Sequence, residues 1–219
     1  MRAKNGKGSS LTHDDQLLRL ELPESNPWQV EASAFKRKCN RQLLRLALCA
    51  GPITHGLQVG CGTGAFTKEL APHCERLTVM DVEPQTLSLT RLRMQGFSHI
   101  DWAVYEEQRW SGNELFNLIV LTDLLCHFPS IAELPTATEN LVGMLAPDGH
   151  LIFGSARDSI RRHWGNFAGA ESAIATLNPK LSQLLRVRCQ GDDSSEDYVF
   201  VLFKNAAQAA DGLANERRD

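Results

Sequence analysis

The sequence lacks several features that would indicate a particular class of function. No apolar run approaches the roughly 20 residues that a membrane-spanning helix needs, and residues 1–16 contain no apolar stretch typical of a signal peptide. Neither sign of charge dominates, because 23 Lys and Arg face 26 Asp and Glu, for a net charge of −3. This balance favours neither nucleic acid nor an anionic membrane surface as a partner. We therefore predict a cytoplasmic protein without a membrane span or a nucleic-acid partner.

The cysteines also lack a recognisable pattern. None of the six forms a C-x-x-C pair, which excludes the common zinc and thioredoxin signatures; they stand at positions 39, 49, 61, 74, 126 and 189. Two of them are adjacent to histidines, but neighbours in sequence rarely point at one metal ion. We expect no metal site and mostly buried, reduced thiols.

Short apolar runs alternate with helical patterns along the chain. A helix is expected where apolar residues recur at helical spacing from Phe35 to Ala47, and a second helix should start at Pro84 and end near Gly96. Ser130 and Glu133 form a capping-box pattern ahead of Leu134, Leu141 and Leu145. Parallel-type strands are expected at 57–59, 77–80, 100–104, 116–121 and 150–154, with a turn at 147–149.

Two further strands, at 184–189 and 198–203, are separated by a polar loop and read as an antiparallel pair. Together with the strand–helix alternation, this predicts an α/β sandwich with a mostly parallel sheet. The 219 residues and their 42% hydrophobic content suit one such domain, which we place at 25–205. Residues 1–24 are expected to be a flexible segment, and 206–219 a disordered tail.

A glycine-rich turn follows the first predicted strand. Gly60, Gly62 and Gly64 alternate with other residues around Cys61, which lets the backbone turn tightly and a ligand approach the main chain. Asp81 stands at the end of the second predicted strand, where a carboxylate can accept the ribose hydroxyls of an adenosine. These residues predict a nucleotide-like cofactor, although the pattern also fits a dinucleotide fingerprint.

Three downstream features favour one class of cofactor. Read as G-x-G-x-G, the turn resembles motif I of class I S-adenosylmethionine methyltransferases. FNLIV at 116–120 resembles the FDLIV strand of that fold, LAPDGHL at 145–151 resembles its LKPGG-x-L turn, and the final strand pair matches the end of its sheet. The expected fold is thus a Rossmann-like class I methyltransferase sandwich, with a mostly parallel seven-stranded sheet and an antiparallel C-terminal hairpin.

A narrower resemblance extends from Leu17 to Lys204. The chain is similar to the NodS-type nodulation methyltransferases, on the segments NPWQVEASAF (26–35), VGCGTGAFTKELAPHCERLTV (59–79), ENLVGMLAPDGHLIFGSARD (139–158) and RHWGNFAGAE (162–171). The resemblance implies S-adenosylmethionine as cofactor and S-adenosylhomocysteine as product. It implies N-methylation of the free amine on the non-reducing glucosamine of a de-N-acetylated chitooligosaccharide, a precursor of Nod factors. Two alternatives stay open: another small amine or hydroxyl acceptor, and a non-catalytic protein that binds the cofactor.

The chain departs from the pattern of this family at several positions. Gln58 stands where an acid usually precedes motif I, and Glu106 stands where an Asp commonly contacts the adenine. Asn117 and Asp148 replace the usual Asp and Gly, and residues 126–128 replace a more aromatic segment. We expect Trp28, Val82, Glu106 and Thr122 to contact the cofactor, together with the glycine-rich turn and Asp81.

Methyl transfer to nitrogen requires an acceptor that has lost its proton. We predict that Asp123, just after the fourth parallel strand, orients the amine and that His127 is the base. The alternatives are a turn cap and a surface histidine. For the sugar, Trp164 can stack on a ring face, and Arg157 can hydrogen-bond hydroxyls as part of a basic cluster in a mostly solvated loop at 157–163. Trp28 and Trp164 fit packing roles equally well.

Overall fold

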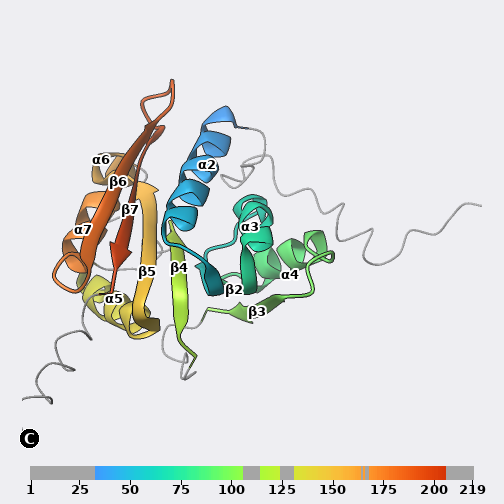
Figure 1. The fold of residues 1–219 in the computed structure, drawn as a ribbon. Coiled ribbons are helices and arrows are strands. Elements are labelled where there is room, and N and C mark those ends of the chain that lie inside the picture. The colour runs from blue at the N-terminus through green and yellow to red at the C-terminus, as the bar shows by residue number, and fades with distance from the viewer. Residues whose placement is uncertain (1–32, 106–113, 124–130, 164, 166–167, 206–219) are drawn as a thin grey trace, which may run out of the picture.

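A seven-stranded sheet forms the centre of the molecule (Figure 1). The computed structural model describes residues 33–105, 114–123, 131–163, 165 and 168–205. The strands are β1 (Ile53–Val59), β2 (Cys74–Asp81), β3 (Ile100–Val104), β4 (Phe116–Thr122), β5 (Leu145–Ala156), β6 (Ser182–Gln190) and β7 (Asp197–Lys204). The predicted flexible segment and tail lie outside the described residues.

The strand order is β3-β2-β1-β4-β5-β7-β6. Strands β1 to β5 pair in parallel, and β7 runs antiparallel to both β5 and β6. This arrangement is the predicted mostly parallel seven-stranded sheet with an antiparallel C-terminal hairpin, so the predicted fold class is confirmed. The order reverses between β1 and β4, and such a switch point is where open α/β sheets bind their ligands.

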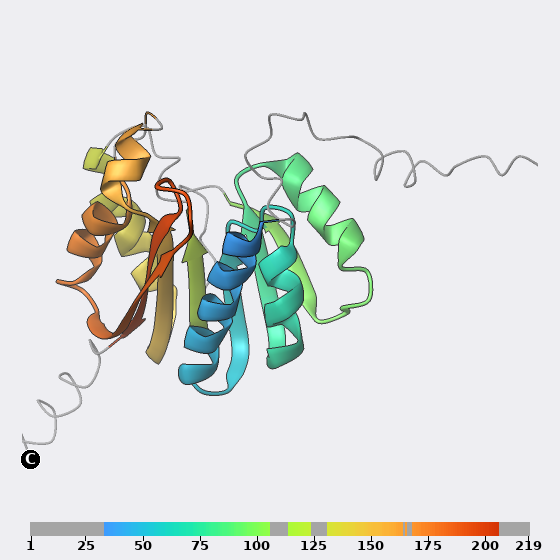
Figure 2. The ribbon, with the colours of Figure 1, turned by 90° about the horizontal axis from the view of Figure 1, so that it is seen from above.

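Helices cover both faces of this sheet. They are α2 (Ala34–Cys49), α3 (Ala65–Leu70), α4 (Pro84–Arg93), α5 (Leu134–Gly143), α6 (Asp158–His163) and α7 (Ala170–Leu177), with the 3-10 turns η2 (Ala71–His73) and η4 (Ile131–Glu133). Figure 2 shows α2 and α3 side by side on one face, where their apolar residues share a core with α4. The core of the other face contains α5 and α7. Among the described residues, no helix is long and apolar enough to cross a membrane.

The central strand β4 explains why the apolar run at 116–121 is continuous. Alternate side chains of a strand point to opposite faces. Ile119 and Leu121 accordingly belong to the core with α5 and α7, whereas Leu118 and Val120 belong to the core with α2 and α3. All four are fully buried, because helices cover both faces of a parallel sheet.

Two predictions for the middle of the chain were wrong. The helix with Leu134 and Leu141 ends at Gly143, and Leu145 belongs to β5 as its first residue. Ser130, which the predicted capping box requires, lies outside the described residues. The expected turn at 147–149 is a bulge within β5, where the register against β4 shifts and Asp148 has a φ of 58°. The residues of this bulge have the sequence pattern of a turn, although the strand resumes after them.

The basic cluster at 157–163 is not a solvated loop. Residues 158–163 form α6, and the Arg161 side chain is buried at the end of the sheet. Burial of a guanidinium requires a charged partner, and Arg161 forms an ion pair with Asp123.

Candidate active site

The glycine-rich turn leaves β1 at the switch point of the sheet. Gly60 donates its N–H to the carbonyl of Met80 over 2.8 Å, which ties the turn to β2. Its φ is 85°, and a Cβ at this position would lie 2.8 Å from the carbonyl oxygen of Thr122, so only glycine fits there. Gly62 also has a positive φ, of 50°, but a Cβ there would meet nothing within 4 Å. The turn is therefore tightly fixed at Gly60 and open at Gly62.

Asp81 holds this turn from the end of β2. One carboxylate oxygen accepts the backbone N–H groups of Cys61 and Gly62, over 2.8 and 3.3 Å, and the other accepts the N–H of Glu83 over 3.1 Å. A carboxylate has about four acceptor positions, so Asp81 keeps capacity for a ligand. Burial, with the nearby Asp81 charge, raises the pKa of the Cys61 thiol to about 12, which makes it a poor nucleophile at neutral pH.

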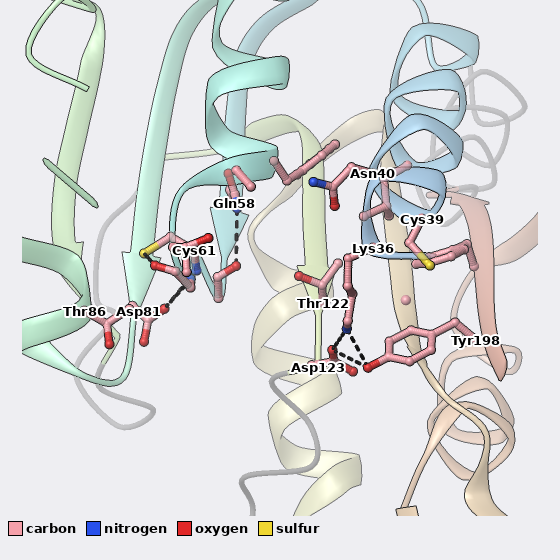
Figure 3. A pocket seen from close by; sticks show the side chains of 18 of the residues that line it. Lys36, Cys39, Asn40, Gln58, Cys61, Asp81, Thr86, Thr122, Asp123 and Tyr198 are labelled. Atoms are coloured by element: carbon pink, nitrogen blue, oxygen red, sulfur yellow. Dashed lines mark hydrogen bonds and ion pairs between the residues drawn. The ribbon is translucent and has the colours of Figure 1, made fainter. Parts of the chain in front are cut away.

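A cavity of about 370 Å³ lies against the turn. It extends across the carboxyl ends of β2, β1 and β4 to α2, β5 and β7 (Figure 3). Most of the described residues that the sequence assigns to the cofactor line it: Gly60, Cys61, Gly62, Asp81, Val82 and Thr122. Asp123, the predicted catalytic residue, lies on the same cavity.

Gly64 differs from the other glycines of the turn. It is the N-cap of α3 and is not among the residues that line the cavity. A Cβ at Gly64 would lie 2.8 Å from the side chain of Thr90 on α4, so this glycine lets the turn pack closely against that helix. Its position indicates a structural role.

The side-chain oxygen of Gln58 is a buried hydrogen-bond acceptor at the cavity wall. The Gln58 side chain is buried, and its Nε2 donates to the carbonyl of Gly60 over 3.3 Å. Its Oε1 has no hydrogen-bond partner in the part of the chain that the structure describes. A buried acceptor without a partner costs stability, commonly about 1–3 kcal/mol. A ligand with N–H donors would remove that cost.

At the other end of the cavity, Asp123 is surrounded by donors. It has a φ of 58°, and its N–H donates to the carbonyl of Gly154 over 2.9 Å. One carboxylate oxygen accepts Ser155 Oγ over 3.1 Å and is ion-paired with Arg161. The other accepts the hydroxyl of Tyr198 over 3.3 Å. Asp123 is thus an anchored carboxylate on the cavity wall.

Lys36 completes this cluster from α2. Its Nζ donates to Tyr198 Oη over 2.8 Å, lies 4.1 Å from the centre of the tyrosine ring and is 3.9 Å from Asp123 Oδ2. Figure 3 shows Lys36, Asp123 and Tyr198 pointing toward one another, away from Asp81. Burial, with the Asp123 charge, holds the pKa of the Tyr198 phenol far above its usual range, so the phenol stays protonated.

Lys36 and Tyr198 were not predicted as site residues, and Arg161 was predicted only as a member of the basic cluster at 157–163. The nearest signal was weak: Lys36 precedes the buried Cys39 and Leu43 by three and seven residues, so all three share one side of the helix. Tyr198 carries no local signal, because it reaches Asp123 only through the pairing of β7 with β5.

Of the remaining predicted residues, Arg157 is the one that the structure describes. Arg157 is bound by two carboxylates, Glu171 Oε1 at 2.5 Å and Asp197 Oδ2 at 3.7 Å, and it does not line the cavity. The predicted residues that lie outside the described part of the chain are Trp28, Glu106, His127 and Trp164. Within the described residues, no group of three potential ligands is placed to hold a metal ion.

Known proteins match the chain over nearly its whole length. The family model "Nodulation protein S (NodS)" matches residues 10–210. Nodulation protein S of Rhizobium tropici is 47% identical over 200 residues, covering 91% of this chain and 84% of that protein. Nodulation protein S of Sinorhizobium fredii (strain NBRC 101917 / NGR234) is 46% identical, covering 87% and 88% respectively.

Solved structures agree with these matches. The crystal structure of N-methyltransferase NodS from Bradyrhizobium japonicum WM9, in complex with S-adenosylhomocysteine, has a TM-score of 0.81 and 44% identity, covering 87% of this chain and 97% of that one. A putative methyltransferase from Pseudomonas syringae, 21% identical with a TM-score of 0.60, shares the fold. The predicted resemblance and the predicted enzyme class, an N-methyltransferase, are confirmed. The chain belongs to the NodS (Nodulation protein S) family.

Proposed function

We propose that the protein methylates the free amine on the non-reducing terminal glucosamine of a de-N-acetylated chitooligosaccharide. The observation that carries this proposal is the cavity that joins the motif I turn and Asp81 at one end to the Asp123 cluster at the other. The donor and acceptor of a methyl transfer must meet in one such space. The acceptor itself rests on membership of the NodS family.

S-adenosylmethionine is the methyl donor of this class of enzyme, and the residues at the turn fit it. The turn is open at Gly62, Asp81 keeps acceptor capacity toward the cavity, and the buried Gln58 Oε1 suits the ammonium of an amino-acid moiety. We propose that Val82 and Thr122 line the donor site, with Trp28 and Glu106 as further contacts. When bound, the donor supplies an electrophilic methyl group: the amine lone pair forms the C–N bond while the C–S bond breaks, leaving its electron pair on sulfur.

The chain's own residues then have to orient the acceptor nitrogen. Asp123 and Tyr198 present oxygens on the cavity wall that can accept N–H bonds from a neutral amine. Orientation of this kind directs the nitrogen lone pair and contributes to the rate. We propose Asp123 for this role, His127 as the group that takes the proton afterwards, and Trp164 and Arg157 as contacts to the sugar.

The test is mass spectrometry of a de-N-acetylated chitooligosaccharide after incubation with the protein and S-adenosylmethionine. A gain of one CH₂ unit on the terminal residue is expected, and a fully N-acetylated chain of the same length should gain nothing. Asp123→Asn should lower turnover by about 100-fold, while donor affinity stays within about threefold of the wild type. Unchanged turnover in this variant would remove Asp123 from the mechanism.

If the oligosaccharide gains no mass, donor binding and activity on other acceptors distinguish the two alternatives. If the protein binds the donor tightly but methylates other small amines or hydroxyls, the acceptor is wrong and the enzyme class is right. If donor binding is tight and none of these acceptors is methylated, the protein is a non-catalytic binder.

A further inference from the structure

The cavity has a third polar region, besides Asp81 and the Asp123 cluster. It is formed by the side-chain amides of Asn40, on α2, and Gln58, the last residue but one of β1, which both line the cavity. Figure 3 shows the amide of Asn40 pointing into the cavity from α2 at the end where Gln58 lies, whereas Lys36 points to the other end, toward Asp123. The two amides therefore border a part of the cavity that neither of the other regions occupies.

The amide of Gln58 has a fixed orientation. Its Nε2 donates to the carbonyl of Gly60, and the reverse orientation would place two oxygens without a hydrogen against each other. Its Oε1 is therefore an acceptor, and it has no hydrogen-bond partner in the part of the chain that the structure describes. A buried acceptor in this state is stabilised by a ligand that brings an N–H group.

Asn40 supplies the complementary donor. Four side chains of α2 line the cavity: Lys36, Cys39, Asn40 and Leu43. Lys36, one turn before Asn40, is held by Tyr198, and a thiol and an alkyl group offer at most a weak donor. The half-buried amide of Asn40 carries two N–H groups, so it is the strong donor that α2 offers at this end of the cavity.

The methyl donor of this class of enzyme carries three groups on its sulfur: an adenosyl group, the methyl group and an α-amino-acid arm. The proposed function directs the ribose of the adenosyl group to Asp81 and the methyl group toward Asp123. We propose that the amino-acid arm binds between Asn40 and Gln58, with its ammonium donating to Gln58 Oε1 and its carboxylate accepting from Asn40 Nδ2. This inference rests on the proposed function for the directions of the other two groups, and not for the identity of the acceptor.

Both amides are neutral, so they recognise the arm through hydrogen bonds and not through ion pairs. Each bond has one charged member, the ammonium or the carboxylate, and such bonds are roughly twice as strong as those between neutral groups. An amide at position 40 favours the carboxylate of the ligand, whereas an acid at the same position would repel it. Asn40 thereby acts as a specificity-determining residue for donors that carry this carboxylate.

The experiment compares three ligands by calorimetry: S-adenosylhomocysteine, its decarboxylated analogue, and methylthioadenosine, which lacks the whole arm. Asn40→Ala should lower the affinity for S-adenosylhomocysteine by about tenfold or more, and Asn40→Asp should lower it by about 30-fold or more. Asn40→Ala should bind the other two ligands within about threefold of the wild type, because neither has the carboxylate.

Two further variants test the other end of the arm and the effect of charge. Gln58→Met removes the buried acceptor and should weaken, by about tenfold, both ligands that have an ammonium. Methylthioadenosine reports on the adenosyl site alone, so an equal loss for all three ligands would contradict the assignment of Gln58. Gln42→Glu is the matched control for Asn40→Asp: it adds a carboxylate to α2, but Gln42 does not line the cavity, so the three affinities should stay near those of the wild type.

The outcomes separate this inference from the proposed function. Wild-type affinity for S-adenosylhomocysteine in Asn40→Ala would overturn the inference, and so would an equal loss for the decarboxylated analogue, because Asn40 would then not bind the carboxylate. The expected binding pattern without methyl transfer to the oligosaccharide would support the inference and reject the proposed acceptor. If the wild type binds none of the three ligands, both fail together.

Discussion

The carboxylate of Asp123 forms an ion pair with the guanidinium of Arg161, 38 residues further along the chain. Arg161 is only 5% exposed, so the pair lies at the boundary between the cavity and the core. The pair anchors Asp123 from behind, while Lys36 and Tyr198 contact it from the side of the cavity. A single side chain thereby serves both the stability of the fold and the shape of the site.

Removing Asp123 should therefore destabilise the protein. Asp123→Ala leaves the buried Arg161 without this partner and should lower the free energy of unfolding by about 3–5 kcal/mol, measured by urea denaturation. Asp101→Ala is the control, since Asp101 pairs with Arg76 at the surface and its loss should cost under about 1 kcal/mol. Equal losses in the two variants would contradict a structural role for the Asp123–Arg161 pair. For this reason Asp123→Asn is the better variant for activity.

The sheet and the motif I turn were predictable because their signals are local. The apolar run at 116–121 is buried on both faces, and the glycines at 60 and 62 have the positive φ values that their spacing suggested. Asp81, predicted to contact the cofactor, lies on the cavity beside this turn, because the carboxyl ends of neighbouring parallel strands share one edge of the sheet.

The Asp123 cluster was not predictable in the same way. Its members come from α2, the end of β4, α6 and β7, and they meet only through tertiary packing. The sequence shows Arg161 as one of several basic residues in a row, and nothing local distinguishes the one that is buried. The bulge in β5 was missed for a related reason, since Pro147 and Gly149 are typical of turns and the strand continues past them.

The contact of Asp81 with the donor can be tested by a conservative change. Asp81→Asn removes the charge that holds the turn, and it should weaken binding of S-adenosylmethionine by about tenfold or more in calorimetry, because hydrogen bonds to a charged group are worth about 1.5–3 kcal/mol. Asp101→Asn, on the neighbouring strand β3, should keep wild-type affinity. Wild-type affinity in Asp81→Asn would mean that the donor does not use this carboxylate.

Asp158 should make stability depend on pH. Burial alone would raise the pKa of Asp158, but hydrogen bonds from the side chain and N–H of Ser172 and from the N–H of Gly169 outweigh it and lower the pKa. The contribution to stability is therefore complete above the ordinary Asp pKa of about 3.9. It is lost as the pH falls through the lower pKa of the folded state.

Comparison of Asp158→Asn with the wild type measures this contribution. The variant should be less stable by about 1–3 kcal/mol at neutral pH, and the gap should close as the pH drops below about 4. Asp192→Asn, in the exposed loop between β6 and β7, should match the wild type throughout. A gap for Asp158→Asn that stays constant down to about pH 2 would show that the charge of Asp158 is not what stabilises α6 against α7.

Two glycine variants separate the two roles of the motif I turn, which are to hold a strained backbone conformation and to leave space for a ligand. An alanine costs about 1–2 kcal/mol at any positive φ, so both Gly60→Ala and Gly62→Ala should lose at least that much stability. Gly60→Ala should lose more, because its Cβ would lie 2.8 Å from the backbone oxygen of Thr122, which cannot move without disturbing β4.

Gly62→Ala should instead affect binding. Its added methyl group meets no atom of the described protein within 4 Å, and Gly62 lines the cavity, so the methyl occupies space that we assign to the donor. Calorimetry should show S-adenosylmethionine affinity reduced by about tenfold, although urea denaturation shows a folded protein. If Gly62→Ala binds the donor like the wild type, the donor does not approach the main chain at Gly62, because a methyl group at a close contact cannot be accommodated without cost.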